Sequence, residues 1–305
     1  KIVLLALFGA TAGQAVVWYG GQFYALFFLE KVLQVDARAA NLVIAAALLI
    51  GTPFFIVFGA LSDRWGRKPI VLAGCALAVL TYFPVFKALT HYANPALERA
   101  VAEAPVQVLS DPADCSFQFD PVGRAAFTSA CDIAKFALAK AGIPYSTRRS
   151  GSGALVQIGT GDTATRLPSF DGGGLDPGEL ARRRAEFTAV LQRELAAAGY
   201  PPKANMEEVN FPVLVALCAY LVLLATMVYG PLAAWLVELF PTRIRYTAMS
   251  MPYHIGNGWF GGFLPVTSFA IVAATGDIYS GLWYPVVVAS MTVVIGGLFL
   301  RDGRQ

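Results

Sequence analysis

Long apolar windows separated by short polar turns dominate both ends of the chain. About 20 consecutive apolar residues cross the hydrocarbon core of a bilayer, and a spanning segment must be helical because lipid offers its backbone no hydrogen-bond partners. Six windows have that length, at residues 2–29, 41–61, 69–89, 211–240, 247–274 and 281–300. The pattern predicts an all-α polytopic membrane protein with six spanning helices.

A polar stretch of roughly 120 residues, at 90–210, interrupts these windows, whereas connections within helical bundles usually have about 2–8 residues. Helical spacing predicts helices at 124–141 and 177–198, and short runs bounded by Pro, Gly and Ser predict strands at 106–109, 116–119 and 154–158. We therefore expect a small inserted α+β module. The chain then divides into residues 1–89 with three spanning helices, the insert at 90–210, and residues 211–305 with three more helices and a short tail.

Composition supports the membrane interpretation. The chain is 56% hydrophobic and only 14% charged, against roughly 25% charged residues in ordinary soluble domains. The formal net charge of +3 is small, and basic residues in the short loops account for it. The sequence therefore gives no support for nucleic-acid binding.

Basic residues in the short loops predict how the chain is oriented, because cytoplasmic loops carry an excess of Lys and Arg. The loops after the second and fourth windows and the tail after the sixth contain Arg64, Arg67, Lys68, Arg243, Arg245, Arg301 and Arg304. The opposite short loop at 276–280 has no basic residue. We expect a bacterial inner-membrane protein with both termini in the cytoplasm and the insert in the periplasm.

Two loop motifs indicate a family. The segment GALSDRWGRK at 59–68 resembles the G-x-L-[AS]-D-[RK]-x-G-R-[RK] signature of major facilitator superfamily transporters, and ELFPTRIR at 238–245 resembles the E-x-[FY]-P-T-x-x-R pattern of proton-coupled metabolite facilitators. In order and loop signature the chain is similar to the C-terminal six-helix half of the metabolite:proton symporter branch. The resemblance covers roughly residues 1–89 and 211–301 and leaves the insert unexplained.

In that family these loop charges hold the cytoplasmic face closed, so the resemblance implies a cytoplasmic gate here. The matching residues are Asp63, Arg64, Gly66, Arg67, Glu238, Arg243 and Arg245. We expect Asp63 to accept a hydrogen bond from Arg245 or from a helix N-terminus, and Glu238 to accept two from Arg67. The alternative is that these charges only set the orientation of the helices.

Polar faces inside two windows are candidate substrate contacts. Unpaired amides are costly in lipid, and transporter sites often lie beside interrupted helices. The first window carries Gln14, Trp18 and Gln22 at three- and four-residue spacing, and the fifth carries His254 and Asn257 among Pro and Gly residues. We predict that these five side chains contact the substrate. Hydrogen bonding between helices and simple packing remain the alternatives.

The four cysteines divide between the insert and the windows. Cys115 and Cys131 lie in the insert, where an oxidising compartment favours a disulfide between them. Cys75 and Cys218 lie in apolar windows, where a thiol behaves as a small hydrophobe. The cysteines lack the spacing of a metal site, and we expect neither a metal nor a cofactor.

The resemblance implies a secondary transporter that moves a small polar metabolite, such as an organic acid or a betaine-like solute, by alternating access with protons. Facilitators have two six-helix halves, so the expected partner of this chain is a missing N-terminal half. No Asp or Glu occupies the middle of a window, and the usual proton-coupling carboxylate is therefore not expected in this chain. The alternative is a non-transporting sensor or assembly protein whose insert binds a ligand or partner. An enzyme is not predicted, because no acid, base and nucleophile converge.

Overall fold

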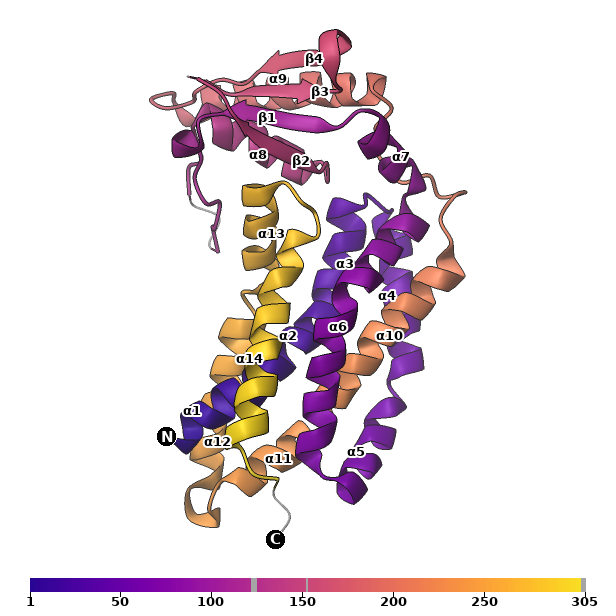
Figure 1. Cartoon of the computed structure of the whole chain (residues 1–305), viewed down its shortest axis with the longest axis vertical. Helices are drawn as coiled ribbons and strands as arrows, with labels where there is room; N and C mark the ends of the chain where they lie inside the picture. Colours follow the sequence, from indigo (N-terminus) through magenta and orange to yellow (C-terminus); the bar gives the residue numbers. More distant parts are fainter. Residues whose placement is uncertain (122–124, 152, 303–305) are drawn as a thin grey trace.

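The structure is a computed structural model and describes residues 1–121, 125–151 and 153–302. Helices long and apolar enough to cross a membrane occupy Ile2–Val32, Ala37–Trp65, Arg67–Ala93, Phe211–Leu239, Thr242–Thr275 and Ser280–Phe299. Each overlaps one predicted window, and the prediction of six candidate spans is confirmed. They form a bundle with a small module at one end, and the N-terminus and the end of the sixth span lie at the other end (Figure 1).

Several of these spans are built from shorter helical pieces. The first span alternates between α-helical and π-helical geometry, through α1 (Ile2–Ala6), η1 (Leu7–Thr11), α2 (Ala12–Tyr19), η2 (Gly20–Tyr24), α3 (Ala25–Phe27) and η3 (Phe28–Val32). The fifth span begins with a 3₁₀ turn, η6 (Thr242–Ile244), and continues through α12 (Arg245–Ile255), the π-helical η7 (Gly256–Gly261) and α13 (Leu264–Thr275). Such π-helical turns are uncommon and often occur at functional sites.

The second and fourth spans break at prolines. Pro53 separates α4 (Ala37–Gly51) from α5 (Phe54–Trp65), and Pro231 separates α10 (Phe211–Tyr229) from α11 (Leu232–Leu239). Proline removes a backbone donor and disrupts the preceding turn. The third span, α6 (Arg67–Ala93), runs through Pro84, and the sixth combines η8 (Ser280–Leu282) with α14 (Trp283–Phe299).

The bundle is held together by close approach of its helices. The fourth span packs through α10 against α6 and α4, and α14 packs against α6 and α2. Glycines permit the contact between the first and sixth spans, because a Cβ on Gly13 would lie 2.5 Å from the Cβ of Thr292, and one on Gly296 would lie 2.2 Å from the carbonyl oxygen of Gly9. Small residues at such positions let helix backbones approach without a side chain between them.

The module between the third and fourth spans contains a mixed sheet. Its elements are α7 (Pro95–Glu103), β1 (Val106–Ser110), η4 (Pro112–Asp114), α8 (Ala130–Lys140), β2 (Tyr145–Arg149), β3 (Leu155–Ile158), η5 (Gly161–Thr163), β4 (Thr165–Pro168) and α9 (Pro177–Ala197). The strand order is β2-β1-β3-β4, with β1 and β2 parallel and the other pairs antiparallel. The α8 helix is the crossover between the two parallel strands and packs on β1 and β3. A small α+β insert is therefore present.

The structure corrects two predictions for the insert. Residues 116–119 form no strand, because the Ser116 N–H donates to Asp132 Oδ1 and the Gln118 side chain donates to the Asp132 carbonyl, both on α8. The helix predicted at 124–141 begins at Ala130, since Ser129 caps it by accepting from the Asp132 N–H. The start predicted at residue 124 lies outside the described residues.

Candidate functional site

Two amide side chains meet where the first and fifth spans cross. Gln14 on α2 is fully buried. Its Nε2 donates to Asn257 Oδ1 over 3.4 Å, and Asn257 Nδ2 donates back to Gln14 Oε1 over 3.3 Å. Asn257 Nδ2 also donates to the Tyr253 carbonyl over 3.0 Å. The reciprocal bonds are long, near the limit of useful geometry, so the two amides hold each other only weakly.

Trp18 lies one turn along α2, within an aromatic cluster. Its ring centroid is 4.5 Å from that of Tyr229 and 6.1 Å from that of Phe55. The hydroxyl groups of Tyr229 and Tyr253 share a hydrogen bond of 2.9 Å. The cluster thus joins four spans through α2, α5, α10 and α12, next to the amide pair.

Backbone irregularity surrounds the amide pair. Asn257 lies in η7, and Gln22, which is 9% exposed, lies in η2. A Cβ on Gly261 would lie 2.4 Å from the Tyr19 ring, so only glycine permits this approach of η7 to the first span. The structure brings together Gln14, Trp18 and Asn257, while Gln22 lies two turns farther along the first span.

His254 lies apart from the amide pair. Its ring is exposed and makes its contacts within α12, where Nδ1 lies 2.8 Å from the Ser250 carbonyl and 3.2 Å from Ser250 Oγ. A role for His254 in substrate contact stays a prediction.

A charged cluster joins the second, third and fourth spans at the end opposite the sheet. Arg67 Nη1 forms an ion pair with Glu238 Oε1, and Arg67 Nη2 lies 3.3 Å from Asp63 Oδ1. The Arg67 and Glu238 side chains are about one-quarter exposed, whereas that of Asp63 is 69% exposed. Gly66, at a φ of 102°, makes the turn that places Arg67 at the start of α6.

Lys68 extends this cluster to the sixth span. Its Nζ donates to the carbonyl oxygens of Gly297 over 2.8 Å and Leu300 over 2.7 Å. A cation is favourable at these carbonyls because the C-terminal end of a helix carries partial negative charge. Residues 63–68, Glu238 and residues 297–300, which are distant in sequence, therefore meet at one end of the bundle.

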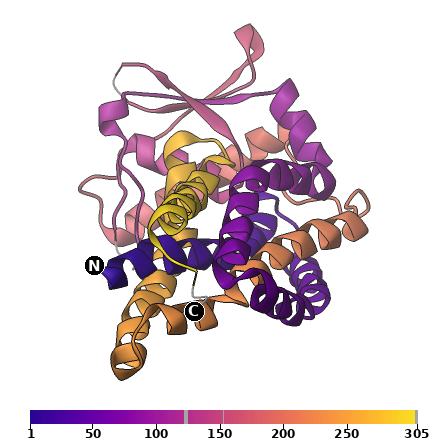
Figure 2. The ribbon, with the colours of Figure 1, turned by 60° about the horizontal axis from the view of Figure 1, so that its bottom comes forward.

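The pairing within this cluster differs in detail from the expected one. Asp63 accepts from Arg67, while Arg245 Nε donates to the Phe240 carbonyl over 3.2 Å. Glu238 uses one oxygen for Arg67, and its Oε2 is buried without a partner among the described residues. Figure 2 shows α11 and α12 meeting at a corner on the periphery of the bundle, and Arg245 lies in that corner at the start of α12. Arg64 and Arg243 are exposed, and Arg304 lies outside the described residues.

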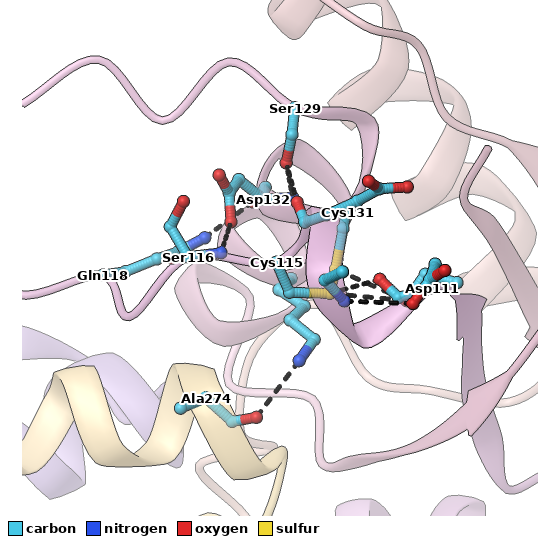
Figure 3. The surroundings of a disulfide bond; sticks show 12 residues. Asp111, Cys115, Ser116, Gln118, Ser129, Cys131, Asp132 and Ala274 are labelled. Atoms are coloured by element: carbon cyan, nitrogen blue, oxygen red, sulfur yellow. Dashed lines mark hydrogen bonds between the residues drawn. A yellow bond between two sulfur atoms is a disulfide. The ribbon is translucent and has the colours of Figure 1, made fainter. Parts of the chain in front are cut away.

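The structure joins Cys115 and Cys131 as a disulfide with a Cα–Cα distance of 5.3 Å. Asp132 follows at the start of α8 and is 2% exposed. Figure 3 shows Ser116 and Gln118 directed at Asp132, with Ser129 above the start of the helix. The disulfide and these bonds fix residues 115–118 to the first turn of α8. Cys75 and Cys218 are buried free thiols.

The insert binds the end of α13 through two residues that the sequence interpretation missed. Lys135 Nζ donates to the Ala274 carbonyl over 3.1 Å, and the Tyr145 hydroxyl donates to the Ala273 carbonyl. Burial lowers the pKa of Lys135, although the nearby Asp132 carboxylate opposes the shift, and burial raises the pKa of Tyr145. The last carbonyls of a helix lack hydrogen-bond partners within that helix. Lys135 and Tyr145 supply donors to two of these carbonyls at the end of α13. The available signal was Lys135 itself, placed one turn after Cys131 on the apolar face of the predicted helix.

Comparison with known proteins points to transport. No protein-family description matches the chain, and no solved structure matches it. A segment of 102 residues is 29% identical to the citrate-proton symporter of Klebsiella pneumoniae. It covers 33% of this chain and 23% of the symporter, so the match spans less than a quarter of that protein. With six apolar helices, the similarity supports a multi-pass membrane protein of the transporter type.

Proposed function

We propose that the chain is the C-terminal half of a facilitator-type secondary transporter that moves an organic acid or a betaine-like solute by alternating access, coupled to protons. The ion pair between Arg67 and Glu238 carries this proposal, because it links the third and fourth spans at one end of the bundle. The partial similarity to a citrate-proton symporter supports a membrane transporter, and citrate is itself an organic acid.

The charged cluster suits a gate. A partly exposed ion pair contributes only about 0–1 kcal/mol, which is small enough to be broken in each transport cycle. Arg67 meets Glu238 only while the third and fourth spans lie together, whereas Asp63 lies four residues before Arg67 across the Gly66 turn. Closing the bundle at this end thus gains contacts that the open state lacks, and this difference biases the equilibrium between the two states.

The amide pair suits a polar solute. Gln14 and Asn257 offer N–H donors to a carboxylate, and the Trp18 indole offers an aromatic face to a cationic or apolar part. The two amides belong to different spans. A solute bound between them replaces their mutual hydrogen bonds, so its affinity depends on the distance between the two spans. Proton coupling and the rest of the solute site are assigned to the missing N-terminal half.

The orientation follows from the same arrangement. The loops with Arg64, Arg67, Arg243 and Arg245 are at the end of the bundle opposite the sheet (Figure 1). The positive-inside rule then assigns that end to the cytoplasm and the insert to the periplasm of a bacterial inner membrane.

Uptake by the whole gene product in proteoliposomes tests this function, with citrate and glycine betaine as solutes. Gln14→Leu and Asn257→Leu are expected to raise KM at least about tenfold, as for the loss of roughly 1.4 kcal/mol of solute binding. The matched control is Thr81→Val, because Thr81 Oγ accepts a 3.0 Å bond from Tyr220 between two other helices. If Gln14→Leu only lowers thermal stability, as the control does, and leaves KM unchanged, the amides hold helices together and bind no solute.

A further inference from the structure

A cavity of about 570 Å³ lies between the insert and the fifth span. Phe127 and Phe136 line it from the insert, and Phe269 lines it from α13. Ligand sites commonly have about 300–1,000 Å³. A second cavity of about 500 Å³ shares Phe136, Lys140 and Arg184 with the first, so the space continues between α8 and α9.

The polar lining of the cavity is mainly cationic. Lys31, Lys140 and Arg184 contribute three positive charges, and Asp120 contributes one negative charge. Asp120 accepts from the Ala125 N–H over 2.9 Å, and Lys31 Nζ lies 4.0 Å from Glu30 Oε2. Arg184 donates through Nη2 to the Phe127 carbonyl, while its Nε is buried and has no partner within the described part of the chain. The site therefore has donors and positive charge left for an anion.

The opposite wall of the cavity extends along a membrane span. Val266, Phe269, Ala270 and Ala273 of α13 line it, and α13 ends at Thr275. At 1.5 Å per residue, Val266 lies roughly 14 Å along the helix from that end, a length close to half of a hydrocarbon core of about 30 Å. The described part of the loop after β1 reaches the start of the same helix, since the rings of Phe119 and Phe263, the residue before α13, are 6.4 Å apart, and Figure 1 shows the coloured part of this loop descending beside α13.

From this geometry we propose that the cavity binds an acidic phospholipid from the leaflet that faces the insert. Its phosphate lies among Lys31, Lys140 and Arg184, because Lys and Arg donate strong, charge-assisted hydrogen bonds to phosphate oxygens. An acyl chain lies along the apolar wall formed by α13. A small hydrophilic anion leaves that wall without a partner, and a zwitterionic lipid leaves the excess positive charge unbalanced. This site is separate from the amide pair and does not depend on the proposed transport function.

Lipid binding to the whole gene product in neutral detergent tests the proposal. Native mass spectrometry and thermal unfolding are expected to show that phosphatidylglycerol binds and stabilises, while phosphatidylcholine at the same concentration does not. Lys31→Gln and Lys140→Gln are each expected to weaken phosphatidylglycerol binding about fivefold, the effect of one basic side chain near an anionic head. Arg193→Gln is the control, because Arg193 is an exposed cation of α9 that pairs with Glu194 outside the cavity.

Three competitors identify the occupant. Inorganic phosphate that binds as tightly as phosphatidylglycerol shows a soluble-anion site and overturns the proposal. Oleate that binds more tightly identifies a free fatty acid and overturns the phospholipid assignment. Equal binding of phosphatidylcholine, or an Arg193→Gln effect as large as that of Lys140→Gln, also overturns it, because the cavity cations then play no selective part. Weak competition by phosphate and oleate upholds it.

Discussion

Arg67 contacts two acids that belong to different spans, and this makes its removal informative. Arg67→Ala leaves Glu238, which is about one-quarter exposed, without its cation. We expect a stability loss of about 1 kcal/mol and slower solute turnover, with solute affinity largely kept. Asp63→Asn should have a smaller effect, since the Asp63 side chain is 69% exposed. Thermal unfolding and uptake of the whole protein measure both quantities.

A double-mutant cycle separates this pair from its surroundings. Glu238→Gln and Arg67→Ala should be non-additive, because each single change removes the same interaction. Additive effects on turnover would contradict the gate, leaving the charges a role only in orientation.

Prediction from sequence at the residue scale worked where a motif fixed the positions of both partners. The loop motifs indicated that Arg67 and Glu238 would meet, and the structure brings them together. The expected bond from Arg245 to Asp63 was wrong. The direction of the Arg245 side chain depends on the corner between α11 and α12, where the Phe240 carbonyl lies within reach. Hydrophobic periodicity contains no information on how such a corner turns.

At the scale of elements, the end of α13 depends on the insert. Tyr145→Phe removes the donor to the Ala273 carbonyl, and Lys135→Met removes the donor to the Ala274 carbonyl while keeping an apolar stem. Each loss should destabilise the protein by about 1–3 kcal/mol, the cost of leaving a buried carbonyl unpaired. Hydrogen exchange should rise in the last turn of α13. Arg148→Gln on the exposed part of β2 is the control, and equal exchange in all variants would refute this docking.

Lys135 also predicts a dependence on pH. Burial lowers its pKa in the folded protein, whereas the unfolded chain keeps a value near 10.4. Between these two values the unfolded state binds more protons, so the stability of the wild type rises with pH relative to Lys135→Met. Thermal unfolding of both proteins from pH 8 to about 10.4 measures the difference. A constant difference across that range would contradict the effect of burial on Lys135.

The disulfide stabilises the start of α8. It joins cysteines separated by 16 positions, and a loop of about 15 residues gains roughly 3 kcal/mol from closure. Cys115→Ser with Cys131→Ser should lower the unfolding temperature of the insert by a corresponding amount. Peptide mapping of exported, non-reduced protein should recover the linkage, with Cys75 and Cys218 as the two free thiols. Four alkylated thiols before reduction would reject it.

Elements of the insert were predictable where one face is buried and less so elsewhere. The alternation in β1 and β3 marks strands with one buried face, and both were predicted. By contrast, β2 is exposed beyond Tyr145 and β4 is a polar edge strand, so neither shows a hydrophobic pattern. β2 is a strand because it pairs in parallel with β1. The two strands are distant in sequence, so a local pattern cannot predict this pairing.

For the whole molecule, length and hydropathy were enough to predict six candidate spans, because a bilayer imposes one rule on every helix. That rule does not predict how the insert packs against the ends of the spanning helices. This packing rests on contacts between distant segments, such as the 3.0 Å bond from the Ala204 N–H to the Gln34 carbonyl and the 3.1 Å bond from Asn94 to the Leu33 carbonyl. The predicted boundaries of the insert at residues 90 and 210 stay a prediction.

Deletion of the insert distinguishes the transporter from the sensor. The Asn210 N–H donates to the Tyr92 carbonyl over 2.9 Å, so a short Gly-Ser linker can join α6 to α10 without moving either helix. We expect the shortened whole protein to keep solute uptake, because the gate and the amide pair lie outside the insert, and to be less stable, because α13 loses its partners. Uptake that persists and is lost on adding Gln14→Leu supports transport through the bundle. Two results together would assign ligand binding to the insert instead. The shortened protein would be correctly inserted but show no uptake, and the full-length protein would still bind solute when it carries Gln14→Leu.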